Sequence, residues 1–155
     1  MISGDTQKMI LIAHRGNTNG PNLIFENDPG YLQMAMDNGY HVEVDVWLDK
    51  HGFMLGHDIP LFPVSQQFLL DDRVWCHAKN ELALDSLLKL DAHCFWHKDD
   101  ERTMTSKGWV WTNTGAPMID HRSVQVDASL DNVLLINKLA KAICSDYVSH
   151  LRIKS

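Results

Sequence analysis

The alternation of strand and helix signals along the chain predicts an α/β fold built as one domain over residues 1–155. A continuous apolar run at 9–13 is typical of a strand that is covered on both faces. Residues 41–48 alternate, with valines on one face and Glu43 and Asp45 on the other, which is a second strand signal. Right-handed strand–helix–strand units joined in this way build a parallel sheet.

Helix signals lie between the predicted strands. Asp28 is a suitable N-cap, Pro29 suits the first helical turn and Gly39 can end the helix. The leucine-rich segment 81–90 also has helical spacing. The remaining predicted elements are a return strand at 53–56, strands at 74–78, 93–97, 109–112, 123–126 and 142–148, and a helix at 130–142.

Polar side chains follow several of these strands, at the end where α/β barrels and open parallel sheets bind their ligands. They are Arg15, Asp45, Lys79, His97, Asn113 and Asp146. A complete (β/α)8 barrel takes about 200 residues or more, so several helices would have to be reduced to loops here. We therefore expect an α/β fold in the form of a trimmed or incomplete TIM (β/α) barrel.

Composition excludes some partners. A net charge of −6 argues against a broad surface for nucleic acid or anionic membranes. No apolar stretch approaches the ~20 residues of a membrane span, and the run at 9–13 is too short for a secretion signal. The three cysteines, at 76, 94 and 144, are interpreted as buried free thiols, which favours a cytoplasmic location.

Glu43 and Asp45 are candidate metal ligands, because carboxylates at i and i+2 of a strand lie on the same face. Buried carboxylates need a compensating charge, and oxygen ligands favour hard cations such as magnesium or calcium. An exposed edge strand with solvated acids would give the same pattern.

Four further residues have side chains suited to phosphate chemistry. His14 and His57 each follow an apolar stretch and could exchange protons near neutral pH. Arg15 could hold a phosphate through a bidentate contact, and Lys79 could neutralise phosphate charge. Taken alone, each of these residues more often has a structural, surface or ion-pair role.

Read in order, these residues form a series of motifs: His14-Arg15-Gly16, Glu26-Asn27, Glu43-Val44-Asp45, Lys50-His51-Gly52 and His57-Asp58. Their order and spacing strongly resemble the start of the glycerophosphodiester phosphodiesterases. That family is related to phosphatidylinositol-specific phospholipase C and to sphingomyelinase D. The resemblance is specific over residues 10–58 and diffuse beyond Lys79.

The resemblance implies a TIM-barrel enzyme that hydrolyses a small glycerophosphodiester-like substrate. His14 and His57 would be the acid–base pair, and Arg15 and Lys79 would hold the phosphate. Cleavage would proceed through attack by a neighbouring hydroxyl of the alcohol, with a cyclic phosphate as intermediate or product.

The resemblance also implies a divalent metal, magnesium or calcium, bound by Glu43 and Asp45. The family has a third acidic ligand in an E-x-K pattern, where this chain has His77-Ala78-Lys79. If His77 is a ligand, its nitrogen would favour manganese or zinc.

Two alternatives remain open at this point. One is a phospholipase of the sphingomyelinase D kind, against which the absence of an evident apolar membrane-docking loop or secretion signal counts. The other is a catalytically silent domain that binds a phosphate or sugar phosphate, which the exchanged ligand at His77 favours. A shortened barrel would also expose apolar surface, which a homodimer could cover.

Overall fold

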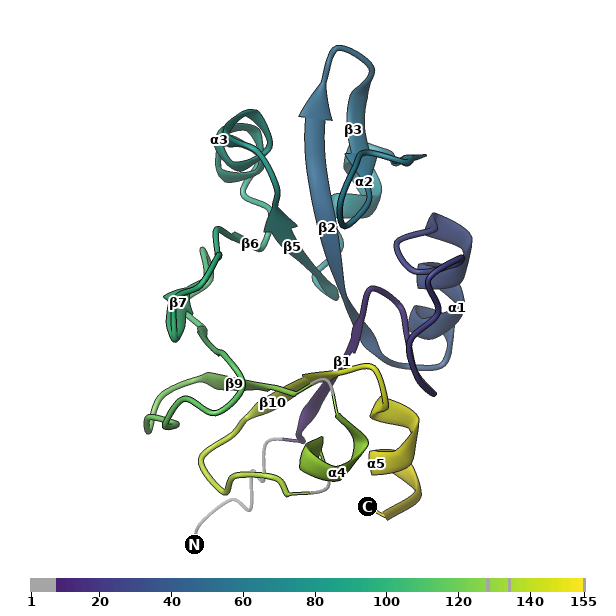
Figure 1. The fold of residues 1–155 in the computed structure, drawn as a ribbon. Coiled ribbons are helices and arrows are strands. Elements are labelled where there is room, and N and C mark those ends of the chain that lie inside the picture. Colours follow the sequence, from purple (N-terminus) through teal and green to yellow (C-terminus); the bar gives the residue numbers. More distant parts are fainter. Residues whose placement is uncertain (1–7, 128, 134, 155) are drawn as a thin grey trace, which may run out of the picture.

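The computed structural model describes residues 8–127, 129–133 and 135–154 (Figure 1). The strands are β1 (Ile10–His14), β2 (His41–Asp49), β3 (Gly52–Leu55), β4 (Phe62–Pro63), β5 (Val74–Ala78), β6 (Cys94–Phe95), β7 (Arg102–Met104), β8 (Val110–Thr112), β9 (Ser123–Val126) and β10 (Ala142–Ser145). The helices are α1 (Pro29–Asp37), α2 (Gln66–Leu69), α3 (Glu81–Lys89), α4 (Leu130–Val133) and α5 (Val148–Lys154).

All the strands belong to one curled, mixed sheet that has the shape of a half-barrel. Its central run, in the order β6-β5-β2-β1-β10-β9-β8, is parallel throughout. Antiparallel strands extend it at two places, β3 and β4 beside the second half of β2, and β7 beside β8. The carboxyl ends of the parallel strands therefore meet at one edge of the curl.

The prediction of a trimmed or incomplete TIM barrel is wrong. Within the described residues, β6 pairs only with β5 and β7 pairs only with β8, so no ladder closes the sheet. The segment that joins β6 to β8 contains the antiparallel strand β7 in place of a helix. A parallel crossover through a helix needs about a dozen or more residues, whereas only ten residues, 113–122, connect β8 to the parallel strand β9.

The predicted helix at 130–142 is wrong as well, since α4 ends at Val133. Further along, the backbone N–H of Asn137 donates to the Gln125 side-chain oxygen at 2.8 Å, and the Gln125 amide donates to the Leu135 carbonyl at 3.4 Å. These bonds to β9 pair backbone groups that a longer helix would have used internally, so the chain continues as a loop.

The sheet separates two apolar clusters. On its outer face, Val42, Val44 and Val46 pack with residues of α1 and α3, among them Leu32 and Leu87. Inside the curl a second cluster holds Trp75, Phe95, Trp109, Trp111 and neighbouring small side chains. The valine alternation of β2 thus places Glu43 and Asp45 on the inner face, as the pattern predicts.

Two smaller predictions can be compared with the structure. Cys76, Cys94 and Cys144 are buried and free, which confirms their interpretation as thiols. In the part of the chain that is described, no helix is both long enough and apolar enough to traverse a bilayer.

Candidate active site

A small cavity of about 180 Å³ opens at the carboxyl ends of the parallel strands. Its walls come from six strands, β1, β2, β5, β6, β8 and β9, and from turns that follow strands: His14, Arg15, Glu43, Asp45, His57, His77, Phe95, His97, Trp111, Asn113 and Val126. Six of the seven site residues expected from the sequence are in this set. Strands that are distant in sequence, such as β1 and β8, contribute to the same cavity because the sheet is curled.

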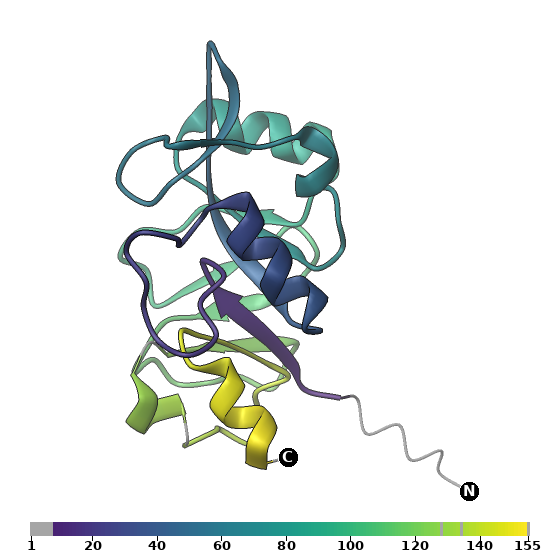
Figure 2. The same cartoon turned by 90° about the vertical axis from the view of Figure 1, so that its right-hand side faces the viewer.

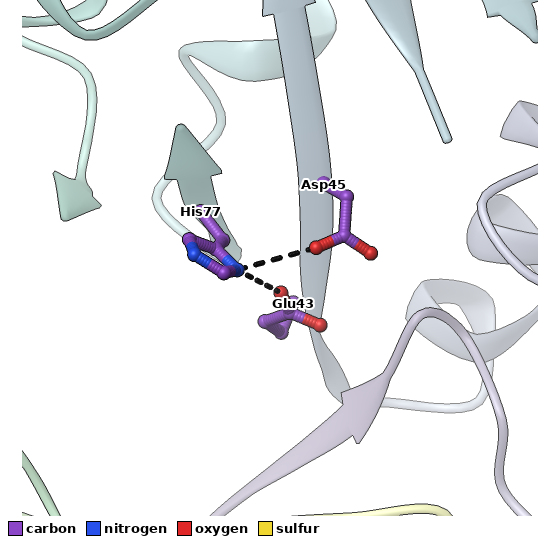
Figure 3. A group of neighbouring side chains, drawn as sticks. All are labelled: Glu43, Asp45 and His77. Atoms are coloured by element: carbon purple, nitrogen blue, oxygen red, sulfur yellow. Dashed lines mark ion pairs between the residues drawn. The ribbon is translucent and has the colours of Figure 1, made fainter. Parts of the chain in front are cut away.

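The centre of the cavity is a group of three side chains from β2 and β5, shown in Figure 3. Glu43 and Asp45 are only 2% and 1% exposed, and β5 lies beside them in register, with Asp45 opposite His77. One ligand atom from each of the three residues lies within 4.8 Å of the other two. Strand pairing therefore brings His77 to the two acids.

Contacts with His97 and Phe95 fix the orientation of the His77 ring. Its Nε2 donates to the backbone carbonyl of His97 at 2.9 Å, and a carbonyl can only accept, so Nε2 carries a hydrogen. Phe95 stacks on the same ring, with centroids 5.2 Å apart and planes at 6°. Nδ1 is consequently held toward Asp45 Oδ1 at 3.3 Å and Glu43 Oε2 at 3.9 Å.

Because His77 Nδ1 faces two carboxylates, the space between them calls for positive charge, either a proton on Nδ1 or a cation. Without a metal, the proton is favoured: burial alone would lower the pKa of His77, but the hydrogen bond to Asp45 and the charge of Glu43 raise it. With a metal, the free electron pair on Nδ1 would become a ligand and the proton would leave.

The two acids differ in their electrostatics. Burial, together with the neighbouring charge of Asp45, raises the pKa of Glu43. Burial would also raise the pKa of Asp45, but hydrogen bonds from His77 and Asn27 and the charge of Arg15 outweigh it and lower the pKa to about 2. Asp45 is thus firmly ionised, whereas Glu43 Oε1 is buried without a hydrogen-bond partner among the described residues.

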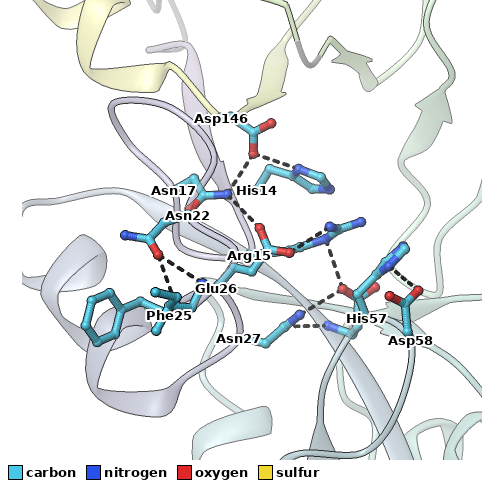
Figure 4. Close-up of polar contacts among 12 residues, drawn as sticks. His14, Arg15, Asn17, Asn22, Phe25, Glu26, Asn27, His57, Asp58 and Asp146 are labelled. Carbon is cyan, nitrogen blue, oxygen red and sulfur yellow. Dashed lines mark hydrogen bonds and ion pairs between the residues drawn. The ribbon is translucent and has the colours of Figure 1, made fainter.

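Arg15 lies at the end of β1 and links the acids to the loop before α1 (Figure 4). Its guanidinium pairs with Glu26 at 3.1 Å and lies 3.2 Å from Asp45 Oδ2. Asn27 holds Asp45 from the other side, accepting the Asp45 N–H and donating to its Oδ2, both at 3.0 Å. The Glu26-Asn27 motif therefore positions the arginine and one of the acids.

Two residues around this loop, Arg15 and Asn27, have positive φ angles, which residues other than glycine rarely adopt. Arg15 and Asn27 have φ angles of 56° and 68°, and a bond of 3.0 Å from the Asn27 N–H to the Arg15 carbonyl joins them. At Gly16, with φ of 88°, an added Cβ would lie 2.9 Å from the Tyr31 ring. The glycine of the His-Arg-Gly motif is thus required by the turn and by the close approach of Tyr31.

His14 is held between two carboxylates. Nδ1 donates to Asp146 Oδ1 at 2.9 Å, and Nε2 lies 3.7 Å from Glu43 Oε1. Burial would lower the pKa of His14, but Asp146 and Glu43 together raise it. Asp146 is itself fixed by the Asn17 amide at 2.9 Å, so the orientation of His14 depends on a buried network.

His57 approaches the cavity from the turn after β3 and is more exposed. Its Nδ1 lies 2.8 Å from Asp58 Oδ1, so the neighbouring residue orients the ring at the border of the cavity. The two histidines therefore border the same small volume, each with Nδ1 paired with a carboxylate, and Nε2 of His14 also faces Glu43.

Lys79 is the one expected site residue that does not line the cavity. It follows the last residue of β5, and its backbone N–H donates to the Val46 carbonyl at 2.8 Å. Conversely, Asn27, Asp146 and Phe95 support the site but are not among the site residues that the sequence predicts. The sequence contains a signal for two of these residues: Asp146 is a polar residue at a strand end, and Asn27 lies in the Glu26-Asn27 motif. No sequence signal marks Phe95 as a site residue.

The donor set fits a divalent cation. Two buried carboxylates and one imidazole nitrogen converge, and Glu43 Oε1 accepts no hydrogen bond from the described residues. Carboxylate oxygens suit magnesium or calcium, and the added nitrogen suits manganese or zinc. Comparison of the chain with protein-family models, with curated proteins and with solved structures found no match.

Proposed function

We propose that this protein is a metal-dependent phosphodiesterase that hydrolyses a small, glycerophosphodiester-like substrate. The observation that carries the proposal is the convergence of two histidines oriented by carboxylates, an arginine and a three-residue cation site on one cavity of about 180 Å³. A cavity of this size suits a headgroup rather than a long chain, since pockets for drug-sized ligands are commonly about 300 Å³ or larger.

In this proposal Glu43, Asp45 and His77 hold the cation, which when bound supplies Lewis-acid stabilisation to the phosphoryl oxygens. Arg15 offers its guanidinium to the same oxygens from the end of β1. The contacts of Arg15 with Glu26 and Asp45 fix the guanidinium before the substrate arrives, which reduces the reorganisation needed during the reaction.

His14 and His57 divide the proton transfers. One Nε2 takes the proton from the attacking hydroxyl of the substrate, whose oxygen then bonds to phosphorus. The other gives its proton to the departing alcohol oxygen as the old P–O bond breaks. The products of that step are an alcohol and a cyclic phosphate, which water can open in a second step with the roles of the histidines exchanged.

The test is a panel of water-soluble phosphodiesters incubated with the purified protein and magnesium, calcium, manganese or zinc. We expect metal-dependent release of alcohol, loss of turnover with EDTA, and a cyclic phosphate visible by ³¹P NMR. Absence of hydrolysis across the panel, with metal binding confirmed by calorimetry, would contradict the proposal and favour a silent phosphate-binding domain.

A further inference from the structure

The loop between β1 and α1 presents three large apolar side chains in succession to solvent. Leu23, Ile24 and Phe25 are 87%, 77% and 50% exposed. Single exposed apolar residues are ordinary on protein surfaces, but a consecutive run of three is a feature that calls for a partner.

The loop holds these side chains outward by a fixed set of bonds, drawn in Figure 4. Asn22 Oδ1 accepts the backbone N–H groups of Ile24 and Phe25 at 3.1 Å and 3.0 Å, and the Asn22 carbonyl accepts from Glu26 N–H at 2.9 Å. The backbone polar groups of the turn are thus satisfied locally, and its shape does not depend on burying the apolar side chains.

The run lies beside the candidate site. The loop leaves the sheet at Arg15 and returns at Glu26, and these two residues are paired with each other. A second loop, which follows the cavity residue His57, exposes Ile59 and Leu61 by 57% and 55%. Figure 2 shows both loops on the same side of the molecule, one above the other. We call these five side chains, Leu23, Ile24, Phe25, Ile59 and Leu61, the apolar rim.

The charge around the rim selects among the surfaces that could cover it. Residues 16–38 and 51–72, which contain both loops, include no lysine or arginine. The same loops carry the acidic residues Glu26, Asp28 and Asp58. An anionic bilayer would gain nothing from such a surface and would be repelled by it, whereas a zwitterionic lipid surface accepts apolar side chains without needing cations.

We infer that the apolar rim docks the protein on a zwitterionic lipid surface, and that the headgroup phosphodiester of such a lipid reaches the cavity. The docking stands on the rim alone; the second part rests on the proposed function. No sequence pattern indicates that this loop is exposed, because three apolar residues in a row are equally typical of a buried strand.

Docking is tested by sedimentation of the full chain with phosphatidylcholine vesicles. We expect wild-type protein to partition onto the vesicles. The double variant Leu23→Ser/Ile24→Ser should bind about tenfold or more weakly, because it loses two apolar side chains whose transfer from water into the lipid is favourable. Both side chains are highly exposed, so the fold is expected to persist, which circular dichroism checks. The matched control is Met34→Ser/Leu88→Ser, which removes two exposed apolar side chains from α1 and α3 and should leave partitioning unchanged.

Three results would overturn the docking: no binding of wild type to phosphatidylcholine, equal binding by the Leu23→Ser/Ile24→Ser variant, or binding that requires anionic lipid. A fourth result would also overturn the docking: wild-type protein does not bind vesicles but is a dimer in gel filtration, and the double variant is a monomer. The rim would then be an interface between two copies of the chain.

The substrate part is tested by comparing hydrolysis of a dispersed lipid phosphodiester with that of a water-soluble one. We expect the double variant to lose turnover on the lipid and to keep it on the soluble diester. Vesicle binding without any hydrolysis would remove the proposed function and leave the docking in place. Hydrolysis of the soluble diester without vesicle binding would support the proposed function and overturn the docking.

Discussion

His14 and His57 border the same cavity but are positioned in opposite ways. His14 is 25% exposed and is held by Asp146, which lies 132 residues away along the chain, and by Glu43 on the neighbouring strand. His57 is 43% exposed and is held by the next residue, Asp58, which is itself 89% exposed. One ring is thus fixed by the tertiary structure and the other by a local turn, so their partners should differ in importance.

The largest effect is expected from removing either imidazole. His14→Ala and His57→Ala should each lower turnover of a phosphodiester by about 100- to 10,000-fold, which is the usual contribution of a general acid or base. Steady-state rates at saturating metal would measure it. His51→Ala, at an exposed histidine on the turn between β2 and β3, is the control. A His14 or His57 variant that works like wild type would remove that residue from the acid–base pair.

The cation site includes Glu43, which contacts His14, whereas His57 is held by Asp58. Loss of the cation site should therefore affect the surroundings of His14 more than those of His57. Glu43→Gln should weaken binding of manganese by about 10- to 100-fold, because a charged ligand becomes neutral in a buried site. Calorimetry would measure the affinity, with Asp120→Asn, at an exposed acid remote in sequence, as the control. Unchanged affinity would exclude Glu43 as a ligand.

His77→Glu extends that experiment by exchanging the nitrogen ligand for a carboxylate. We expect the preference between metals to move from manganese or zinc toward magnesium or calcium. If neither the preference nor the turnover responds, His77 is not a ligand.

A third histidine, His93, extends the comparison, because it is buried and no carboxylate of the described residues pairs with it. His93 donates to or accepts from Thr105 Oγ1 at 2.7 Å and packs on Trp75, with ring centroids 4.1 Å apart. Burial, with a smaller contribution from the charge of Lys107, lowers the pKa of His93 from 6.5 to about 4.

Since the unfolded chain binds this proton more readily, the stability that neutral His93 allows is full above pH 6.5 and is lost as the pH falls toward 4. The free energy of unfolding should drop by about 1–2 kcal/mol between pH 7.5 and pH 5 through this group, as urea titrations would show. His93→Gln, which does not titrate, should flatten that part of the pH profile; an unaltered slope would contradict the assignment.

The smallest effects concern the two partner carboxylates, and they test the comparison directly. Asp146→Asn should lower turnover by about tenfold, because it removes a buried charge that orients His14. Asp58→Asn should cost less than about threefold, since solvent screens an exposed ion pair. Initial rates of both variants at one pH give the answer. An equal loss in the two would mean that local and tertiary positioning matter equally here.

Much of the local structure and of the site was predictable from the chain. The strand signals at 9–13, 41–48 and 74–78 correspond to β1, β2 and β5, and the capped helix after Asp28 corresponds to α1. Five residues of the motifs, His14, Arg15, Glu43, Asp45 and His57, do line one cavity. Periodicity and caps depend on neighbouring residues, so the sequence reports them directly.

The support of the site was harder to foresee. Phe95 fixes the His77 ring by stacking and the His97 carbonyl fixes it by a hydrogen bond, but neither group has a chemical signature in sequence. The exposed Leu23-Ile24-Phe25 run was missed for a similar reason, because burial is a property of the surroundings and not of the residues.

The sequence by itself determined where β1, α1, β2, β5 and α3 begin, to within one residue, and which polar residues follow the strands. Only the tertiary structure decided that the sheet stays open as a mixed half-barrel, with β7 antiparallel beside β8, instead of a (β/α) barrel. Strand pairing and sheet closure depend on the lengths of all connections together and on contacts between residues far apart in the chain. The same long-range packing brings Asp146 to His14 and His77 to the two acids, and no local pattern encodes it.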